Sequence, residues 1–163
     1  MFPNPEQLIG YADRLTYVPE LAFEHARDVI KGRFPEGEKA IASDPEYAYY
    51  YARDVIKGRF PEGEKAITSN SHYAYYYAYY YARYVIKGRF PEGEKAIASD
   101  SYYAYLYALS VIGYRFPEGE KAIASDPYYA YYYARNVIKG RFPEGEKAIT
   151  SSPEYKEKYN ELI

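Results

Sequence analysis

One nine-residue string, Arg-Phe-Pro-Glu-Gly-Glu-Lys-Ala-Ile, occurs five times without change and constrains the fold more than any other feature of the chain. Its copies are spaced by 26, 30, 26 and 26 residues, because they begin at Arg33, Arg59, Arg89, Arg115 and Arg141. Self-similarity at a fixed period of this size is typical of solenoids, in which each module buries its apolar face against its neighbours. We therefore expect a stack of similar modules.

Each module has the start and stop signals of two short helices. In the module 44–69, Asp44 is a good N-cap and precedes a run without helix breakers. Gly58 is expected to end this first helix in a left-handed conformation. Pro61 begins a second helix, which Gly63 weakens by about 1 kcal/mol relative to alanine. The pattern predicts an all-α solenoid of helix-turn-helix repeats, with about twelve helices in a right-handed stack and no sheet.

The buried side of the first helix follows from its periodicity. Wound at about 100° per residue, it places Ala48, Ala52 and Val55 together. Tyr51 flanks this stripe together with Ile56, while Tyr47 and Tyr49 lie further out at the edges. Most tyrosines are therefore expected to be packing residues.

The opposite side of the first helix is polar and aromatic. Tyr50, Arg53, Asp54 and Lys57 face outward in the same winding. In the first module the outward position of Tyr50 is occupied by Glu24. We therefore expect one tyrosine in each module to point at solvent.

The two ends of the chain depart from the repeat, as terminal modules do when one of their faces has no neighbour. We expect a single domain over residues 1–163, with an N-terminal cap at 1–18, five repeats at 19–152 and a C-terminal capping helix at 153–163.

The composition of 26 tyrosines, 7 phenylalanines and no tryptophan implies many half-buried positions.

The third module has four extra residues, which we place at 78–81. This insertion predicts a first helix that is longer by about 6 Å. Residues 58–87 carry four Lys or Arg against two Glu, whereas 32–57 carry four against five acids. The segment is thus locally basic and rich in tyrosine. Two readings stay open, a neutral lengthening of one helix and a protruding contact site.

The fourth module replaces outward polar positions with leucine. Leu106 stands where other modules have tyrosine, Leu109 replaces an arginine, and Gly113 with Tyr114 replaces Lys-Gly. Two outward leucines predict a small apolar patch of the kind found at interfaces.

The sequence gives little sign of catalysis or of a bound cofactor or metal. The chain has no cysteine and only two histidines, of which His25 is expected to pack and His72 to be exposed. Glu62 and Glu64 recur in every module, and this recurrence favours a solvated helix start over a catalytic pair. No long apolar run or signal-peptide order occurs, and the formal net charge is −2. We expect a soluble cytoplasmic protein that is not an enzyme and needs no cofactor.

Binding is the function class that the repeat pattern favours. Tyrosine and arginine at regular intervals are the residue types enriched at protein-interface hot spots. The same types stack on bases, so single-stranded nucleic acid is a rival partner, and self-assembly into a homo-oligomer is a third possibility. The candidate contact residues are Tyr50, Arg53, His72, Tyr76, Tyr80, Arg83, Tyr84, Leu106, Tyr132 and Arg135.

The pattern D-P-x-Y-A-Y-Y-Y-A-R-x-V-I-K-G-R-F-P-E-G-E resembles tyrosine-rich α-helical repeats in uncharacterised phage and bacterial proteins. The resemblance covers residues 19 to about 155. It implies a helical repeat fold and a bacterial cytoplasm as the location. It also suggests a small protein that binds and sequesters a host or phage component.

Overall fold

The computed structural model describes residues 10, 13–69 and 72–163 and is helical, with no strand in those residues. This confirms the all-α prediction. The chain divides into two compact units, unit 1 at Met1–Ser69 and unit 2 at Asn70–Ile163, and we describe each by itself. The single domain over 1–163 and its internal boundaries stay predictions. The expected N-terminal capping helix lies largely outside the described residues.

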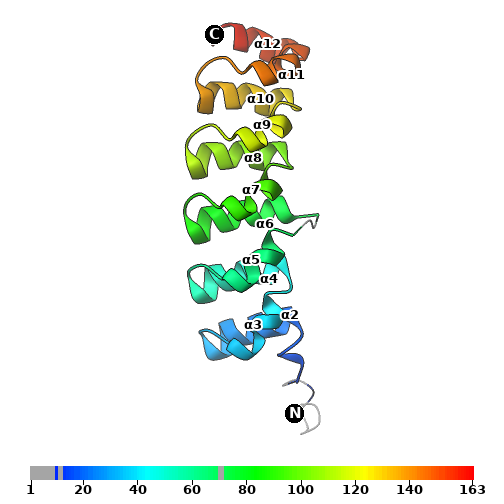
Figure 1. The fold of residues 1–163 in the computed structure, drawn as a ribbon, viewed down its shortest axis with the longest axis vertical. Helices are drawn as coiled ribbons and strands as arrows, with labels where there is room; N and C mark the ends of the chain where they lie inside the picture. Colours follow the sequence, from blue (N-terminus) through cyan, green and yellow to red (C-terminus); the bar gives the residue numbers. More distant parts are fainter. Residues whose placement is uncertain (1–9, 11–12, 70–71) are drawn as a thin grey trace. The chain divides into compact units, whose positions relative to one another are not determined.

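Unit 1 contains two modules, each with a first helix that changes from α to π geometry and a second α-helix (Figure 1). Its first helices pack against each other, and so do its second helices. The elements are α2 (Pro19–Glu24), the π-helical η1 (His25–Ile30), α3 (Pro35–Ile41), α4 (Pro45–Tyr50), the π-helical η2 (Tyr51–Ile56) and α5 (Pro61–Ile67).

Unit 2 repeats the same arrangement three times and ends in one further helix. Its elements are α6 (Ala74–Tyr80), η3 (Tyr81–Ile86), α7 (Pro91–Ile97), α8 (Ser101–Tyr107), η4 (Ala108–Ile112), α9 (Pro117–Ile123), α10 (Pro127–Tyr133), η5 (Ala134–Ile138), the short 3-10 turn η6 (Pro143–Gly145), α11 (Glu146–Ser151) and α12 (Pro153–Asn160). The last of these confirms the predicted C-terminal helix.

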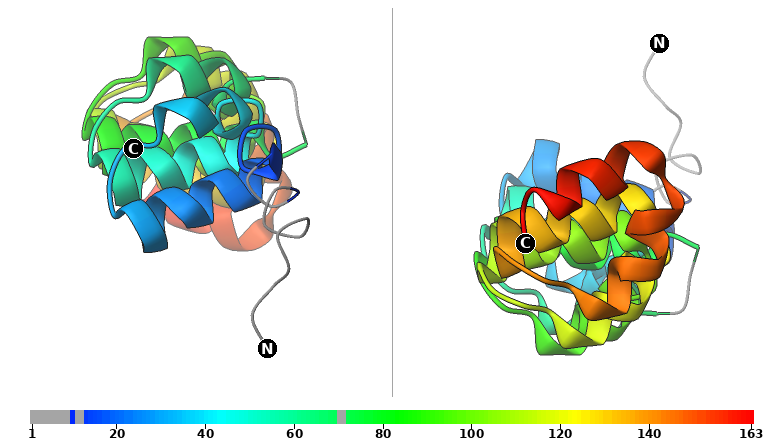
Figure 2. Two further views of the ribbon diagram at one scale, coloured as in Figure 1. Left: turned by 90° about the horizontal axis from the view of Figure 1, so that it is seen from below. Right: turned by 90° about the horizontal axis from the view of Figure 1, so that it is seen from above.

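The first helices of unit 2 form one layer and the second helices another. Helix α8 packs between α6 and α10, and α10 also contacts α12, while α9 packs between α7 and η6. Viewed along the stack, successive first helices lie over one another (Figure 2). Successive modules of the unit therefore cover each other's apolar faces, as expected for a helical-repeat solenoid.

A glycine in each second helix lets the two helices of a module approach closely. A Cβ added at Gly63 would lie 2.6 Å from Cδ1 of Phe60 and 2.8 Å from Cβ of Ala48. The glycines at 37, 93, 119 and 145 are equally close to a phenylalanine and an alanine. The residue that lowers helix propensity is therefore required by packing.

The π segments correct the predicted buried stripe. Val55 and Ile56 are only half-buried, whereas Tyr49, expected at the edge, is 3% exposed. In the first module, Val29 is even 65% exposed. For Val55, Ile56 and Val29, which lie in π segments, the reason is that π geometry, with its i→i+5 hydrogen bonds, turns less per residue than the α-helix assumed in the winding.

The left-handed residue at the end of the first helix is the lysine and not the following glycine. Lys57 has φ 56°, and the equivalent lysines at 31, 87 and 139 have similar values. In the fourth module Gly113 takes this position, with φ 76°. The amide N–H of Gly58 donates to the Ala52 carbonyl and closes the last turn. The expectation for Gly58 was therefore wrong by one position.

We expect Lys57→Gly to stabilise unit 1 by about 0.5–1 kcal/mol, because the left-handed strain on a residue with a Cβ is removed and only part of this gain is lost to the entropy of glycine. Urea denaturation of the full chain measures the difference. Lys57→Ala is the control, since it removes the charge and keeps the Cβ. An equal gain from alanine would show that the backbone strain is not the cause.

The insertion in the third module does not lengthen its helix as predicted. Together α6 and η3 are one residue longer than α4 and η2. Ala78 lies against the Gly93 position as Ala48 lies against Gly63, so the extra residues fall before Ala74. Asn70 and Ser71, where the second and fifth modules have Asp-Pro at the start of the first helix, lie outside the described residues.

The start of α6 explains where the extra residues go. Its N-cap residue, Tyr73, makes no side-chain capping hydrogen bond, whereas Asp44 accepts from two backbone N–H groups at the start of α4. The position of α6 along the chain is fixed by its packing on α7, the second helix of its own module. Helix α6 therefore begins at Ala74, and the expected extended helix is not formed.

Candidate binding surface

Neighbouring modules are joined by a buried tyrosine that bonds to the preceding second helix. The Tyr133 hydroxyl donates to Glu120 at 2.9 Å and accepts the Phe116 N–H at 2.7 Å. Arg115 donates two hydrogen bonds to the same carboxylate, at 2.7 and 2.8 Å. We call this set the tyrosine bridge. It recurs at Tyr51 with Phe34 and Glu38, at Tyr107 with Phe90 and Glu94, and at Tyr159 with Phe142 and Glu146.

The tyrosine bridge corrects the interpretation of the recurring glutamates. Glu62 is exposed, as expected of a solvated helix start. The second glutamate of the pair is different. Glu94 and Glu120, which occupy the position of Glu64 in later modules, are only 6% and 7% exposed. The hydrogen bond from Arg89 lowers the pKa of Glu94 despite the opposing effect of burial. The second glutamate of the pair therefore holds modules together as a carboxylate.

Burial also shifts the titration of the tyrosines. It raises the pKa of Tyr51, in a tyrosine bridge of unit 1, to about 12. Burial beside other tyrosines raises the pKa of Tyr103 in unit 2 to about 12. Both rings therefore stay neutral at pH values where an exposed tyrosine ionises.

We expect the folded protein to lose stability as the pH rises from 10 to about 12. The folded pKa of Tyr51 and Tyr103 lies above the unfolded value of 10.0, so their contribution is complete below pH 10 and lost as pH passes the folded pKa. Denaturation midpoints measured across this range test the slope, and Tyr103→Phe should flatten it. Equal midpoints from pH 9 to pH 12 would contradict the assignment.

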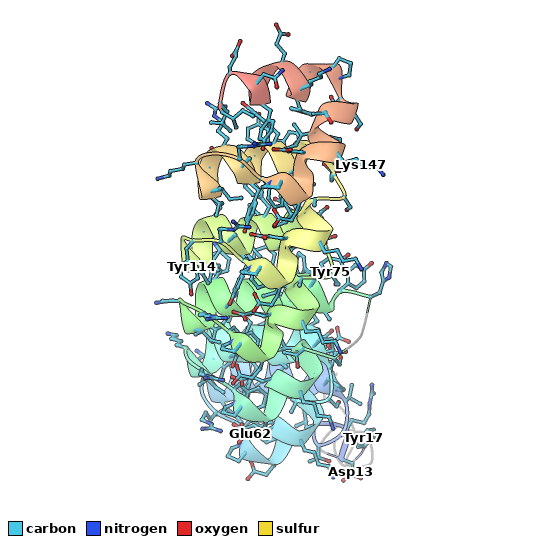
Figure 3. All side chains as sticks on the ribbon, turned by 45° about the horizontal axis from the view of Figure 1, so that its top comes forward. Asp13, Tyr17, Glu62, Tyr75, Tyr114 and Lys147 are labelled. Carbon is cyan, nitrogen blue, oxygen red and sulfur yellow. The ribbon has the colours of Figure 1, made fainter. Side chains whose placement is uncertain are left out.

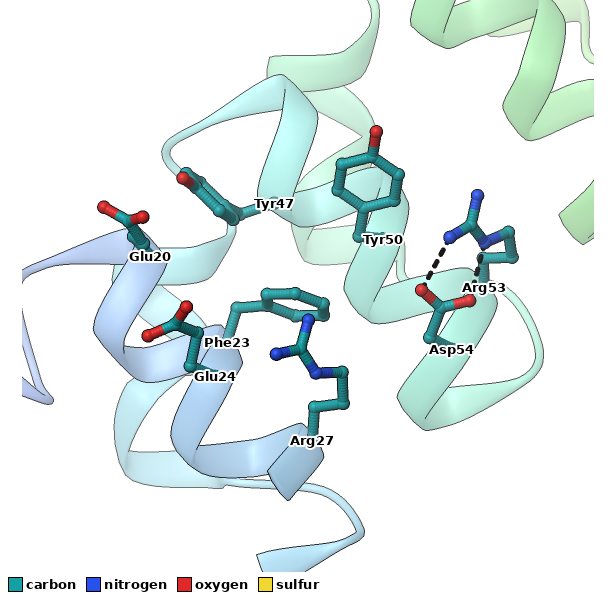
Figure 4. A pocket seen from close by; sticks show the side chains of 8 residues that line it. All are labelled: Glu20, Phe23, Glu24, Arg27, Tyr47, Tyr50, Arg53 and Asp54. Atoms are coloured by element: carbon teal, nitrogen blue, oxygen red, sulfur yellow. Dashed lines mark hydrogen bonds and ion pairs between the residues drawn. The ribbon is translucent and has the colours of Figure 1, made fainter. Parts of the chain in front are cut away.

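Unit 1 has a shallow groove between its two first helices, with a volume of about 380 Å³ (Figure 4). The Phe23 ring lies between Tyr47 at 5.9 Å and Tyr50 at 6.2 Å, measured between ring centroids. The remaining lining residues are charged: Glu20, Glu24, Arg27, Arg53 and Asp54. The groove thus has an aromatic floor and carries both signs of charge.

The arginines of this groove are already paired. Arg53 donates to both oxygens of Asp54, at 2.6 and 2.7 Å, and lies over the Tyr50 ring at 4.8 Å (Figure 4). Arg27 pairs with Asp28 in the same way. Tyr50 is half-buried beneath its arginine, so the expectation that it points fully at solvent was wrong. A ligand of unit 1 would have to displace these ion pairs.

Unit 2 gathers the predicted tyrosines of its third module into one cluster. The rings of Tyr76 and Tyr80 are 4.5 Å apart, and Tyr84 stacks on Tyr80 at 5.7 Å with 10° between the planes. Tyr103 of α8, which sequence reasoning missed, contacts four rings of α6, including Tyr76 and Tyr80. Tyr103 occupies the position of Tyr47 in the repeat, which the winding places at the edge of the apolar side. That edge position was the sequence signal that could have identified Tyr103 as part of the surface.

The arginines of this surface differ from those of unit 1. Arg83 donates to the Tyr79 hydroxyl at 2.8 Å and lies over the Tyr84 ring at 5.5 Å. The residue after Arg83 is Tyr84, and the one after Arg135 is Asn136, where unit 1 has aspartate. In the part of the chain that the structure describes, neither arginine pairs with a carboxylate.

Two residues that stand at the aspartate position of unit 1, Ser110 and Asn136, join neighbouring first helices instead. The Ser110 hydroxyl lies 3.1 Å from that of Tyr79, and the Asn136 amide donates to the Tyr105 hydroxyl at 2.9 Å. Sequence reasoning missed both contacts, because each joins residues that are 31 positions apart. They rigidify the surface on which Arg83 and Arg135 stand.

The other predicted contact residues are distributed around this cluster. Leu106 on α8 and Tyr132 on α10 are half-buried on neighbouring first helices. His72 is exposed, and its ring contacts that of Tyr73 at 5.1 Å. Among the described residues, no ring contact joins His72 to the cluster of Tyr76, Tyr80 and Tyr84. Tyr75 near the start of α6 and Tyr114 beyond η4 mark opposite edges of unit 2 (Figure 3).

His25 packs as expected. Its ring contacts Phe34 edge-on at 5.2 Å, in the position of the bridging tyrosines. Its Nδ1 is buried without a hydrogen-bond partner among the described residues. The first module therefore carries no complete tyrosine bridge at this position.

No protein-family model matches the chain, and neither a curated protein nor a solved structure matches it. The described residues contain no group of three potential metal-ligating side chains. None of the described helices has both the length and the apolar character needed to cross a membrane.

Proposed function

We propose that this chain is a non-enzymatic repeat scaffold that binds another protein through the outward surface of its first helices. The observation that carries the proposal is the surface of unit 2, where Arg83 lies between tyrosines and Arg135 is exposed, and neither has an acidic partner among the residues that the structure describes. Large rings with few rotatable bonds and unpaired arginines are the side chains that give interfaces most of their binding free energy.

The tyrosine bridges support this proposal. Each one ties the helix of its tyrosine to the preceding second helix through the two hydrogen bonds of the hydroxyl, so outward side chains are held at a regular spacing. A surface that is ordered before binding loses less conformational entropy on association. A protein partner would therefore meet a preformed set of rings and cations.

Selection from a random-peptide library on the immobilised full chain tests the proposal. Peptides that bind this surface should lose at least tenfold in affinity with Tyr80→Ala/Tyr132→Ala. The matched control is Tyr17→Ala/Tyr114→Ala, which removes two exposed tyrosines elsewhere. Enrichment of no peptide, or equal losses in both double variants, would refute protein binding through the first helices.

Single-stranded nucleic acid is the second candidate, and the stacked pair Tyr80 and Tyr84 is the observation in its favour. Against it, the arginines that begin the recurring nine-residue string are paired with glutamates, as in Arg89 with Glu94 and Arg115 with Glu120. Oligonucleotide affinity that falls steeply with salt would favour this rival. Self-assembly predicts oligomers in sedimentation at high protein concentration, and a monomer would exclude it.

A further inference from the structure

The first helices of the third and fifth modules carry positive charge, and the first helices of all three modules of unit 2 lack a carboxylate. Residues 72–87, 101–114 and 127–140 contain four Lys or Arg and no Asp or Glu. The corresponding segments of unit 1, 19–32 and 45–58, contain four Lys or Arg and five acids. The overall charge of −2 therefore conceals a cationic first-helix surface on unit 2.

The two aspartates that cap first helices of unit 2 do not neutralise this surface. Asp100 and Asp126 are N-caps at the opposite ends of their helices, where they accept hydrogen bonds from backbone N–H groups. The arginines lie on π segments at the other end of the first helices, Arg83 on η3 after α6 and Arg135 on η5 after α10. An anion approaching Arg83 or Arg135 thus meets no repelling carboxylate of the same helix.

The cationic surface is interrupted in its middle by apolar side chains. Segment η4 packs between η3 and η5 and presents Leu109, which is 40% exposed, at the place of the two arginines. The half-buried Leu106 lies one turn before it on α8. The order across the three modules is therefore basic, apolar, basic.

We infer that the partner of this surface is a peptide segment with acidic residues at both ends and an apolar residue between them, an inference that rests on the proposed protein-binding function. The acids pair with Arg83 and Arg135, whose planar guanidinium groups suit bidentate carboxylate bonding. The apolar side chain covers Leu109 on η4, and the exposed Tyr84 lies on η3, which packs against η4.

The module spacing sets the length of the segment. Packed helices lie about 8–10 Å apart, so two steps place Arg83 and Arg135 about 16–20 Å from each other. An extended peptide rises about 3.3 Å per residue, and its acids should therefore be separated by about five or six residues.

The apolar interruption is also what favours a peptide over a nucleic acid. A single strand has a phosphate at every nucleotide and binds best to a continuous cationic track. Here the middle module lacks both outward cations, because Leu109 replaces the arginine and Gly113 the lysine. Restoring the arginine should therefore have opposite effects on the two kinds of ligand.

Two synthetic probes and the full chain provide the test. One probe is a peptide of about eight residues with paired glutamates at its ends and leucines at its centre, matching the extended spacing. The other is an oligothymidylate. The protein variants are Leu109→Arg, Arg83→Gln/Arg135→Gln and the matched control Arg27→Gln/Arg53→Gln, which removes two aspartate-paired arginines at equivalent positions of unit 1.

The expected result is that wild type binds the peptide, that Arg83→Gln/Arg135→Gln weakens it at least tenfold, and that Leu109→Arg weakens it several-fold while the control does not. Wild type that binds the oligothymidylate but not the peptide would overturn the inference in favour of nucleic acid. A peptide with leucines at its ends and glutamates at its centre that binds equally well would overturn the acidic-apolar order. In that last case the library selection would still support protein binding, so the two failures are distinguishable.

Discussion

Gly119→Ala should destabilise unit 2 by about 2–3 kcal/mol, although alanine favours helix by about 1 kcal/mol over glycine. The added Cβ would lie 2.5 Å from Cδ1 of Phe116 and 2.9 Å from Cβ of Ala104. Phe116 is 1% exposed and Ala104 is fully buried, so neither can move without displacing a helix. Chemical denaturation of the full chain measures the loss.

Gly140→Ala is the matched control for this substitution. It makes the same change in the same unit, but no atom lies within 4 Å of the added Cβ. We expect its free energy of unfolding to stay within about 0.5 kcal/mol of wild type. If Gly119→Ala were stabilising instead, helix propensity would outweigh packing, and the close approach of α8 and α9 would be wrong.

Tyr133→Phe should lower the free energy of unfolding by about 1–3 kcal/mol with almost no change in shape. It removes the hydroxyl that accepts the Phe116 N–H and donates to Glu120, and both partners are buried. A buried donor left without a partner costs its full desolvation free energy, which exceeds the net value of an ordinary hydrogen bond. Urea denaturation gives the magnitude.

Tyr132→Phe separates this effect from the general loss of a hydroxyl. Tyr132 is the adjacent residue. It is half-buried, and its hydroxyl makes no hydrogen bond to the described residues. Its variant should therefore lower the free energy of unfolding by less than about 0.5 kcal/mol. A double-mutant cycle of Tyr133→Phe with Glu120→Gln then measures the coupling between modules. Additive losses would show that the tyrosine bridge does not act as a unit.

The candidate surface was only partly predictable. Tyr76, Tyr80, Arg83 and Tyr84 were singled out because they recur on one side of a helix, and the ring contacts of unit 2 bring them together. Their acid-free surroundings depend on which helix each glutamate belongs to. A count of charge along the chain averages the first and second helices and so conceals that separation.

The sequence by itself determined the helical repeat. The recurring string, the Asp-Pro helix starts and the periodic alanines are local signals, and they led to helix pairs in the expected places. It could not give the change to π geometry at Tyr51, because that change depends on hydrogen bonds between turns. The expected position of Val55 followed the wrong winding for this reason.

Only the tertiary structure decided the roles of Glu120, Tyr133 and Gly119. A glutamate at a helix start and a glycine within a helix each have a sufficient local explanation, as a solvated residue and as a weak helix former. Their actual partners lie on another helix, 13 residues away in the case of Glu120 and Tyr133. Burial and close approach are properties of two packed surfaces, so they appear only when both helices are in place.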